Sequence, residues 1–577
     1  TSNFRAGVNA GNSIASGGNY NTVVGDEAGT AITTGESNTA VGFQSLSNAN
    51  TGNSNSAFGT EAMKYTTTGV RNSAFGGRDY DGGVSGYAAL NLNTTGSYNS
   101  AFGQGSLANN TTASNNTAVG YQSLYANTTG TNNVAVGKDA MIANTTGTVN
   151  TSVGVDSLTA NTTGASNTAV GQAALEANTT ASFNTGIGRN ALGANTTGAN
   201  NTATGYNSLL ANTTGADNVA IGALALDACT TGSSIVAIGK GALSTSTTQG
   251  TNVAVGYNAS TNLVTTGVTA IGYQAMATST TGYDSVAVGT NALYSNTSGN
   301  ENTAVGYQAM YSNTTGVDNV AVGNGALDAN TTASNNTAVG RASLTANTTG
   351  AQNTAIGVSA ADAQTTATNT TAVGMNALTA VTTGSNNTGL GVGAGESIQS
   401  GANNVCIGYI TDAAHDSANS ITIGVGITGT GNNFKFGKAS NIVSNVFTTD
   451  ASWARSSDVN KKTNIEDDSL GLNFINNLRT VKFNWRPNSE FPKHYNDYSE
   501  TENHMDTDTR LHGMIAQEVK AALDVEGVDT FGGWLEDEDG SQRISQEMFV
   551  HPLIKAVQEL STQVDELKQE LKTLKGE

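Results

Sequence analysis

A short phrase of two polar and two apolar residues returns along most of the chain and ends at a glycine. In the phrase from Asn116 to Gly120 (NTAVG) successive side chains point to opposite faces, as in a β-strand. We call its last residue the marker glycine. It recurs every 17 residues from Gly25 to Gly408, and only two of the 22 intervals deviate, one of 16 residues and one of 27. A weaker match at Gly424 ends this repeat array.

A period of 17 residues is too short for the known helical repeats, which need about 33 residues or more. It fits one coil of a parallel β-roll or β-helix, with two short strands and two turns. The marker glycine makes the first turn without a steric penalty. Asn127 to Gly130 (NTTG) makes the second, since these residues favour tight turns. The frequent Gly, Asn and Thr leave no apolar stripe of helical period.

Equivalent residues of successive coils form columns along such a stack. Leu124 and its equivalents, four residues after the marker, predict a buried apolar column, and Val119 and its equivalents predict a second one. The opposite face of the strand, with Ala118, is predicted to pack against other chains, because so thin a core is marginal for a single chain. Asn127 and Asn133 represent two columns predicted to form asparagine ladders. Twenty-two steps of about 4.8 Å give a homo-oligomeric shaft of roughly 105 Å.

Composition changes abruptly near residue 450. Residues 1–450 hold 30 charged residues, whereas the 127 residues from 451 to 577 hold 38, together with every Pro and Trp of the chain. We therefore predict a repeat shaft at 1–424, a neck at 425–455 and a separate domain at 456–577. The net charge of −20 argues against a nucleic-acid partner. The sequence shows no apolar run long enough for a membrane helix, and it has only two Cys, too few for a disulfide scaffold.

The repeated phrase resembles the head repeat of trimeric autotransporter adhesins, and similar repeats occur in phage tail fibres. The resemblance covers most of residues 20–424 and implies a trimeric parallel β-roll. The adhesin repeat has a shorter period, so the cross-section of the coil is expected to differ.

Four phrases near the carboxy terminus carry a more specific resemblance. They are SSDVNKKTNI (456–465), LRTVKFNWRP (478–487), LHGMIAQEVKAAL (511–523) and HPLIKAVQEL (551–560). In this order and spacing they resemble the intramolecular chaperone domain of phage tail spikes and fibres, the endosialidase-type auto-processing domain. The resemblance implies a small α+β domain that helps three chains to align and fold and then cuts itself off.

The same resemblance implies the residues of the cut. In that family it falls before the Ser of a Ser-Asp-x-x-x-Lys phrase, which here makes Ser457 the nucleophile, Lys462 the base and Ser456–Ser457 the scissile bond. A partly desolvated Lys can take the proton of the Ser hydroxyl, so the pairing is chemically reasonable. Asn460 and Lys461 stand where the family phrase has a basic and an apolar residue. The alternative is that Ser-Ser-Asp only caps a turn. Any enzymatic activity is at most one self-cleavage per chain.

The last segment predicts a helix with the seam of a coiled coil over 553–575. Val557, Val564 and Leu571 take the a positions, and the d positions hold Leu553, Leu560, Leu567 and Leu574. Val at a with Leu at d favours two strands. The family resemblance implies three, and we expect the long shaft to fix three.

Other candidate sites are few. The His residues of the last domain (His494, His504, His512 and His551) lack metal-ligand spacing, and EDEDG (536–540) lacks the alternation of a calcium loop, so we predict no metal and no cofactor. Ten extra residues at 78–87 interrupt the array. Insertions in repeat arrays emerge on one face, often the binding face, so Arg78, Tyr80 and Tyr87 are candidates for receptor contact, the alternative being a neutral insertion.

These observations favour a structural, homotrimeric phage tail fibre, located in the virion tail and outside the cell. Its expected partners are a host-surface receptor, either a glycan or a surface protein, and a tail or baseplate protein at the amino end. Thr1 is no natural start, so an anchoring segment is expected to precede it. No membrane insertion is expected. The alternative is a bacterial extracellular trimeric adhesin or surface filament, which predicts a secretion signal and a membrane anchor that the sequence does not display. A polysaccharide-cleaving tailspike would need a pair of carboxylates in a groove, and the shaft offers no obvious pair.

Overall fold

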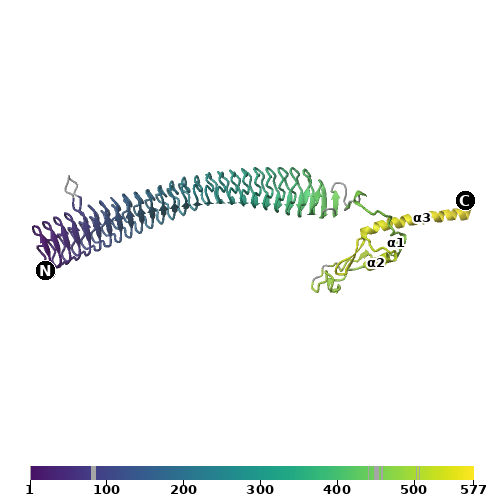
Figure 1. The fold of residues 1–577 in the computed structure, drawn as a ribbon, viewed down its shortest axis with the longest axis horizontal. Helices are drawn as coiled ribbons and strands as arrows, with labels where there is room; N and C mark the ends of the chain where they lie inside the picture. Colours follow the sequence, from purple (N-terminus) through teal and green to yellow (C-terminus); the bar gives the residue numbers. More distant parts are fainter. Residues whose placement is uncertain are drawn as a thin grey trace. The chain divides into compact units, whose positions relative to one another are not determined.

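The computed structural model describes residues 2–78, 86–438, 441–446, 454–455, 459–501, 503, 505 and 507–576. The chain divides into two compact units, Thr1–Ser456 and Ser457–Glu577. Unit 1 is an elongated parallel β-solenoid, which confirms the predicted 17-residue coil (Figure 1).

Each coil of the solenoid contributes one strand, which pairs in parallel with the strand of the next coil. In β7 and β8, Ala118 lies opposite Ala135 and Val119 opposite Val136, so the marker glycines stack as well. The pairing of Ser73 in β5 with Ser100 in β6 shows that the 27-residue interval leaves this register intact. The strands are β1 (Phe4–Ala6), β2 (Thr22–Val24), β3 (Thr39–Val41), β4 (Ser56–Phe58), β5 (Ser73–Phe75), β6 (Ser100–Phe102), β7 (Thr117–Val119), β8 (Val134–Val136), β9 (Thr151–Val153), β10 (Thr168–Val170), β11 (Thr185–Ile187), β12 (Thr202–Thr204), β13 (Val219–Ile221), β14 (Val236–Ile238), β15 (Val253–Val255), β16 (Thr269–Ile271), β17 (Val286–Val288), β18 (Thr303–Val305), β19 (Val320–Val322), β20 (Thr337–Val339), β21 (Thr354–Ile356), β22 (Thr371–Val373), β23 (Thr388–Leu390), β24 (Val405–Ile407) and β26 (Ile421–Val425).

The prediction of a second strand in each coil is wrong. The segment after the marker is a series of turns, because Gln122 and Leu124 adopt left-handed backbone angles with φ of 53° and 50°. Its backbone still bonds to the next coil, since the N–H of Leu124 donates to the carbonyl oxygen of Ala140 at 2.9 Å. The Leu124 column is fully buried, as predicted.

The two faces of the strand are the reverse of the prediction. Ala118 and its equivalents point into the coil and are fully buried, whereas Val119 is 37% exposed. The reason is space. Where Gly186 replaces the inner Ala, an added Cβ would already lie 3.0 Å from the carbonyl oxygen of Ala191 and 3.3 Å from Cγ of Leu175. A coil this narrow accepts a methyl group opposite the Leu column, and the β-branched side chains face outward.

Both predicted asparagine columns are confirmed, and both lie inside the coil. In the first, the side-chain amide of Asn127 donates to the amide oxygen of Asn110 at 3.0 Å. In the second, the amide oxygen of Asn116 accepts from the backbone N–H of Asn133 at 2.9 Å. These ladders satisfy polar groups whose burial would otherwise cost about 1–3 kcal/mol each.

Further strands continue beyond the last regular coil. β28 (Asn433–Lys438) pairs in parallel with β26, and β29 (Asn441–Val446) and β30 (Ala454–Arg455) follow antiparallel. A small parallel pair joins β25 (Asp412–Ala413) to β27 (Thr428–Gly429). The segment predicted as a neck thus carries strands of the same sheet in its described part.

Both cysteines occupy buried column positions. Cys229 stands in the first asparagine column, and Cys406 in the inner alanine column. Burial raises the pKa of the Cys406 thiol to about 12, with a smaller contribution from Asp412. Neither thiol is paired in a disulfide in the described residues.

An ion-pair cluster anchors the start of the 78–87 insertion. The guanidinium of Arg78 lies 2.8 Å from one carboxylate oxygen of Glu61, and Nζ of Lys64 lies 2.9 Å from the other. The Glu61 side chain is only 6% exposed. At the other end, the Tyr87 ring lies 6.1 Å from that of Tyr125. Tyr80 lies outside the described residues.

We predict that Glu61→Gln destabilises this region in a pH-dependent way. Burial alone raises the pKa of Glu61, but the hydrogen bonds and charges of Arg78 and Lys64 outweigh it and hold the pKa below its ordinary value of 4.5. The stabilisation is therefore complete above pH 4.5 and is lost as pH falls through the lowered pKa. We expect a cost of about 1–2 kcal/mol at pH 7. The rate of proteolysis in the insertion measures this loss of stability. A difference in rate between the variant and wild type that persists unchanged at low pH would contradict the prediction.

Unit 2 is a small α+β domain whose longest element is its last helix. Its helices are α1 (Leu472–Asn477), α2 (Ala516–Val525) and α3 (Val550–Lys575), with short 3-10 helices η1 (Val459–Lys461), η2 (Asn488–Glu490) and η3 (Gln546–Phe549). Two antiparallel pairs complete it: β31 (Val481–Phe483) with β32 (Leu511–Gly513), and β33 (Trp534–Glu536) with β34 (Gln542–Ile544).

Candidate functional site

The predicted nucleophile and base belong to the start of unit 2, and Ser456 is the last residue of unit 1. Ser456 and Ser457 fall outside the described residues. Lys462 follows the single turn of η1, and its backbone N–H donates to the carbonyl oxygen of Val459 at 3.1 Å. Its side chain is exposed. The predicted role of Lys462 as a base requires that its side chain be partly desolvated. The described part of the single chain does not bury it.

An aromatic cluster forms the centre of unit 2. Phe474 of α1 is fully buried, and its ring packs edge-on against Phe531 and face-on against Phe549, with centroids 5.9 and 6.2 Å away. Val519 and Leu523 of α2 are buried against this cluster, as their spacing of four residues on one helix face dictates. The cluster joins residues that lie 75 positions apart in the chain.

Three of the four carboxy-terminal phrases lie close together in unit 2. β31 belongs to the phrase 478–487 and β32 to the phrase 511–523, and they pair with Val481 opposite Gly513. Beside this pair lies an apolar groove of about 640 Å³, lined among others by Leu478, Met514 and Leu553. The groove thus collects residues from three of the four phrases that carried the resemblance.

A carboxylate of the last helix holds the start of α1. Glu559 accepts a hydrogen bond from the backbone N–H of Leu472 at 2.7 Å, across 87 residues of sequence. Such an interaction satisfies a free N–H group and complements the positive end of the helix dipole. Sequence reasoning missed Glu559 because nothing in the local pattern links it to α1.

We predict that Gly471→Ala loosens this contact. An added Cβ on Gly471 would overlap the carboxylate of Glu559. The displaced carboxylate leaves the N–H of Leu472 without its partner, at a cost of about 1–2 kcal/mol. Urea unfolding of the full chain, followed by Trp fluorescence, to which Trp485 and Trp534 of unit 2 contribute, measures the change. Gly527→Asn is the control, because Asn tolerates the positive φ of 69° at this position and no atom lies within 4 Å of an added Cβ; equal losses in both variants would contradict the prediction.

The terminal helix is confirmed, and its apolar seam is exposed in the single chain. The a and d side chains from Leu553 to Leu574 are between 40% and 84% exposed. A helix with one exposed stripe of Val and Leu is typical of a coiled-coil strand without its partners.

The acidic turn at 536–540 is held by its own hydrogen bonds. The carboxylate of Asp539 accepts bonds from the backbone N–H of Asn496 at 2.7 Å and from the hydroxyl and N–H of Ser541. These bonds lower the pKa of Asp539 to about 2. Of the predicted non-ligand histidines, His504 lies outside the described residues. Among the residues that are described, no three His, Cys, Asp or Glu side chains form a cluster able to hold a metal ion.

The first part of unit 2 is similar to a known protein family. Residues 457–528 match the family described as chaperone of endosialidase. The match supports the intramolecular chaperone, and it begins at the predicted nucleophile, Ser457. Neither a curated protein nor a solved structure shows significant similarity to the chain. In the described residues, no helix combines the length and apolarity needed to cross a membrane.

Proposed function

We propose that the chain is the trimeric fibre of a phage tail, with a carboxy-terminal chaperone that aligns three copies and then cleaves itself off. The observation that carries the proposal is a coincidence of boundaries. The chaperone match starts at Ser457, and unit 2 starts at the same residue. A folding unit that is later discarded needs its cleavage site at such a boundary.

The architecture of unit 1 supports a role as a shaft. Its described coils repeat one pattern, and their columns of Ala, Leu and Asn serve packing and hydrogen bonding. A solenoid of this kind grows coil by coil and spans distance with little sequence complexity. We propose that it carries unit 2 during assembly and afterwards reaches a host-surface receptor, either a glycan or a surface protein. A tail or baseplate protein is its proposed partner at the amino end, and Arg78, Tyr80 and Tyr87 are proposed contacts of the receptor.

The proposed cleavage is an acyl shift followed by hydrolysis. Lys462 takes the hydroxyl proton of Ser457, and the oxygen attacks the carbonyl carbon of Ser456. The peptide C–N bond breaks, the amine of Ser457 takes up a proton, and an ester joins the two residues. Water then hydrolyses the ester, leaving a carboxylate on Ser456 and a free amino terminus at Ser457. Burial of Lys462 between assembled copies would favour its neutral form.

Truncation tests the chaperone role separately from cleavage. A chain that ends at residue 456 is expected to give unassembled or insoluble shaft. The full chain and its Ser457→Ala variant are both expected to assemble, because the chaperone is present in each. Size-exclusion chromatography with light scattering measures the outcome. Normal assembly of the truncated chain would overturn the proposal.

A further inference from the structure

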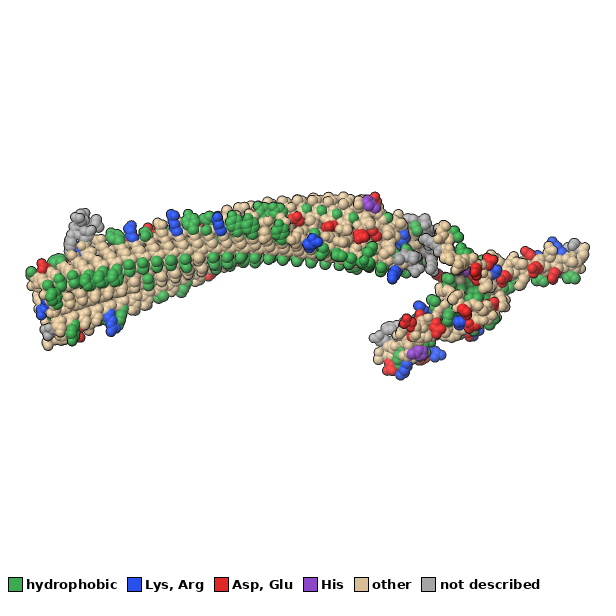
Figure 2. Space-filling model, viewed as in Figure 1, with side chains coloured by type: hydrophobic (Ala, Val, Ile, Leu, Met, Phe, Trp, Pro, Cys, Tyr) green, Lys and Arg blue, Asp and Glu red, His purple; other side chains and the backbone are tan. Residues whose placement is uncertain are grey.

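The outward face of the solenoid strands carries a column that is apolar in every coil but one. We call the residue before each marker glycine, from Val24 to Ile423, the outer column. It holds Val, Ile, Phe or Leu in every coil except at Thr204, and each member is half-buried or exposed. Figure 2 shows hydrophobic side chains as a continuous line along the solenoid.

The neighbouring positions keep this face uncharged. Two residues before the outer column, every coil from Thr22 to Ile421 has Thr, Ser, Val or Ile on the same side of the strand. Neither column contains a charged residue. Charges of the solenoid lie elsewhere, for example at Lys138, Lys240 and Arg341, each one residue after its marker. Near the amino end Phe58, Phe75 and Phe102 stack with ring centroids 4.5 and 4.8 Å apart.

Such a face is unusual for a surface left in water. Parallel sheets are normally covered on both sides, and contiguous apolar patches beyond a few hundred Å² mark interaction sites. With a strand width of about 10 Å and a rise of about 4.8 Å per coil, this face covers roughly 1,100 Å². That exceeds the roughly 800 Å² per partner of a standard protein interface.

We infer that this face, rather than the alanine face, is where copies of the chain pack against one another, parallel and in register. The repeat identifies the occupant. A partner must have the same spacing between coils and the same repeated side chains to present an equivalent side chain at every coil. A parallel copy of the chain has both. The exposed seam of α3 independently predicts association of copies. The inference rests on the proposed trimer and adds the surface that forms it.

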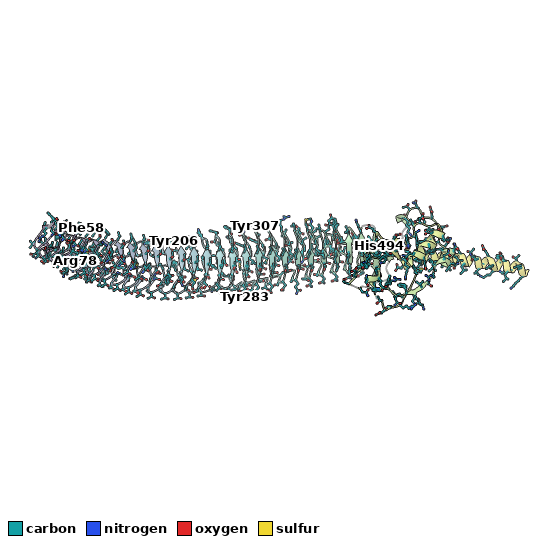
Figure 3. All side chains as sticks on the ribbon, turned by 90° about the horizontal axis from the view of Figure 1, so that it is seen from below. Phe58, Arg78, Tyr206, Tyr283, Tyr307 and His494 are labelled. Carbon is teal, nitrogen blue, oxygen red and sulfur yellow. The ribbon has the colours of Figure 1, made fainter. Side chains whose placement is uncertain are left out.

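Cysteine cross-linking locates the face. Val305→Cys places a thiol in the outer column, where the native side chain is 36% exposed. Tyr307→Cys, two residues on, places a thiol in a different column, the one that directly follows the marker glycines. The native Tyr307 side chain is 49% exposed at the edge of the solenoid (Figure 3). The native Cys229 and Cys406 are buried, so the unaltered chain supplies the background.

A short bis-maleimide is expected to join most chains of the Val305→Cys variant on a denaturing gel and few of the Tyr307→Cys variant. Native mass is measured first on both. Trimers that cross-link through position 307 but not 305, or through neither, overturn the assigned face and leave the proposed function standing. Monomers overturn both.

Charge substitution gives a second readout. The triple variant Val288→Asp, Val305→Asp, Val322→Asp is expected to shift the native mass from three copies to one. The triple variant Thr290→Asp, Tyr307→Asp, Asn324→Asp, on the same coils, is expected to leave three copies. Equal behaviour of the two triple variants would overturn the inference.

Discussion

Gly205→Ala is expected to destabilise the solenoid by about 3 kcal/mol or more, the largest effect we expect from adding a single methyl group. Gly205 has φ of 138°, and an added Cβ would lie 2.6 Å from both the carbonyl carbon and oxygen of Gly222 in the next coil. No side chain can yield there, because both clashing atoms belong to the backbone. Since each coil contacts only its neighbours, the damage should appear as local opening around this coil.

The matched control is Gly325→Asn. Gly325 also has a positive φ, of 64°, but no atom lies within 4 Å of an added Cβ. Asn291 and Gln308 occupy the equivalent position in other coils with φ of 57° and 52°. We therefore expect Gly325→Asn to change stability by no more than about 0.5 kcal/mol. Hydrogen exchange of the solenoid amides compares the variants, and equal protection of the Gly205→Ala coil and wild type would contradict the account.

Ser457→Ala is expected to abolish self-cleavage completely. The wild-type chain should yield a fragment of residues 457–577 whose amino terminus is Ser457, whereas the variant has no hydroxyl to attack the carbonyl of Ser456. Lys462→Met should slow cleavage strongly, because it removes the base while keeping an apolar stem of similar length. Intact mass spectrometry after denaturation measures the 457–577 fragment and the remaining shaft that ends at Ser456.

The control for this experiment is Lys461→Met, which removes the neighbouring ammonium. If Lys462 is the base, Lys461→Met cleaves at a rate close to that of wild type. A wild-type chain that stays full-length after denaturation would contradict the cleavage mechanism, and so would a Ser457→Ala chain that still yields the fragment.

Much of the shaft could be predicted from its period. The marker glycines, the buried leucine column and both asparagine ladders follow from the spacing alone. The faces of the strand could not be assigned in this way, because Ala118 and Val119 are both apolar and alternate at the same period. The width of the coil decides which of the two faces inward. That width depends on the bend of the Leu124 segment through left-handed backbone angles, which the conformational preferences of Leu do not predict.

The candidate site in unit 2 was predictable only where phrases of sequence carry it. The order of the four phrases located the chaperone domain, and the family match begins at the predicted Ser457. Contacts between distant segments were out of reach, because Glu559 and Leu472 meet only once α1 and α3 have packed. The same holds for Arg78, whose partner Glu61 lies in the preceding coil.

The number of chains in the assembled particle tests the central claim most directly. Native mass spectrometry of the intact assembly, with the cleavage-deficient Ser457→Ala variant to keep unit 2 attached, gives that number without assumptions about shape. We predict three copies of the chain. A particle of one or two copies would contradict it.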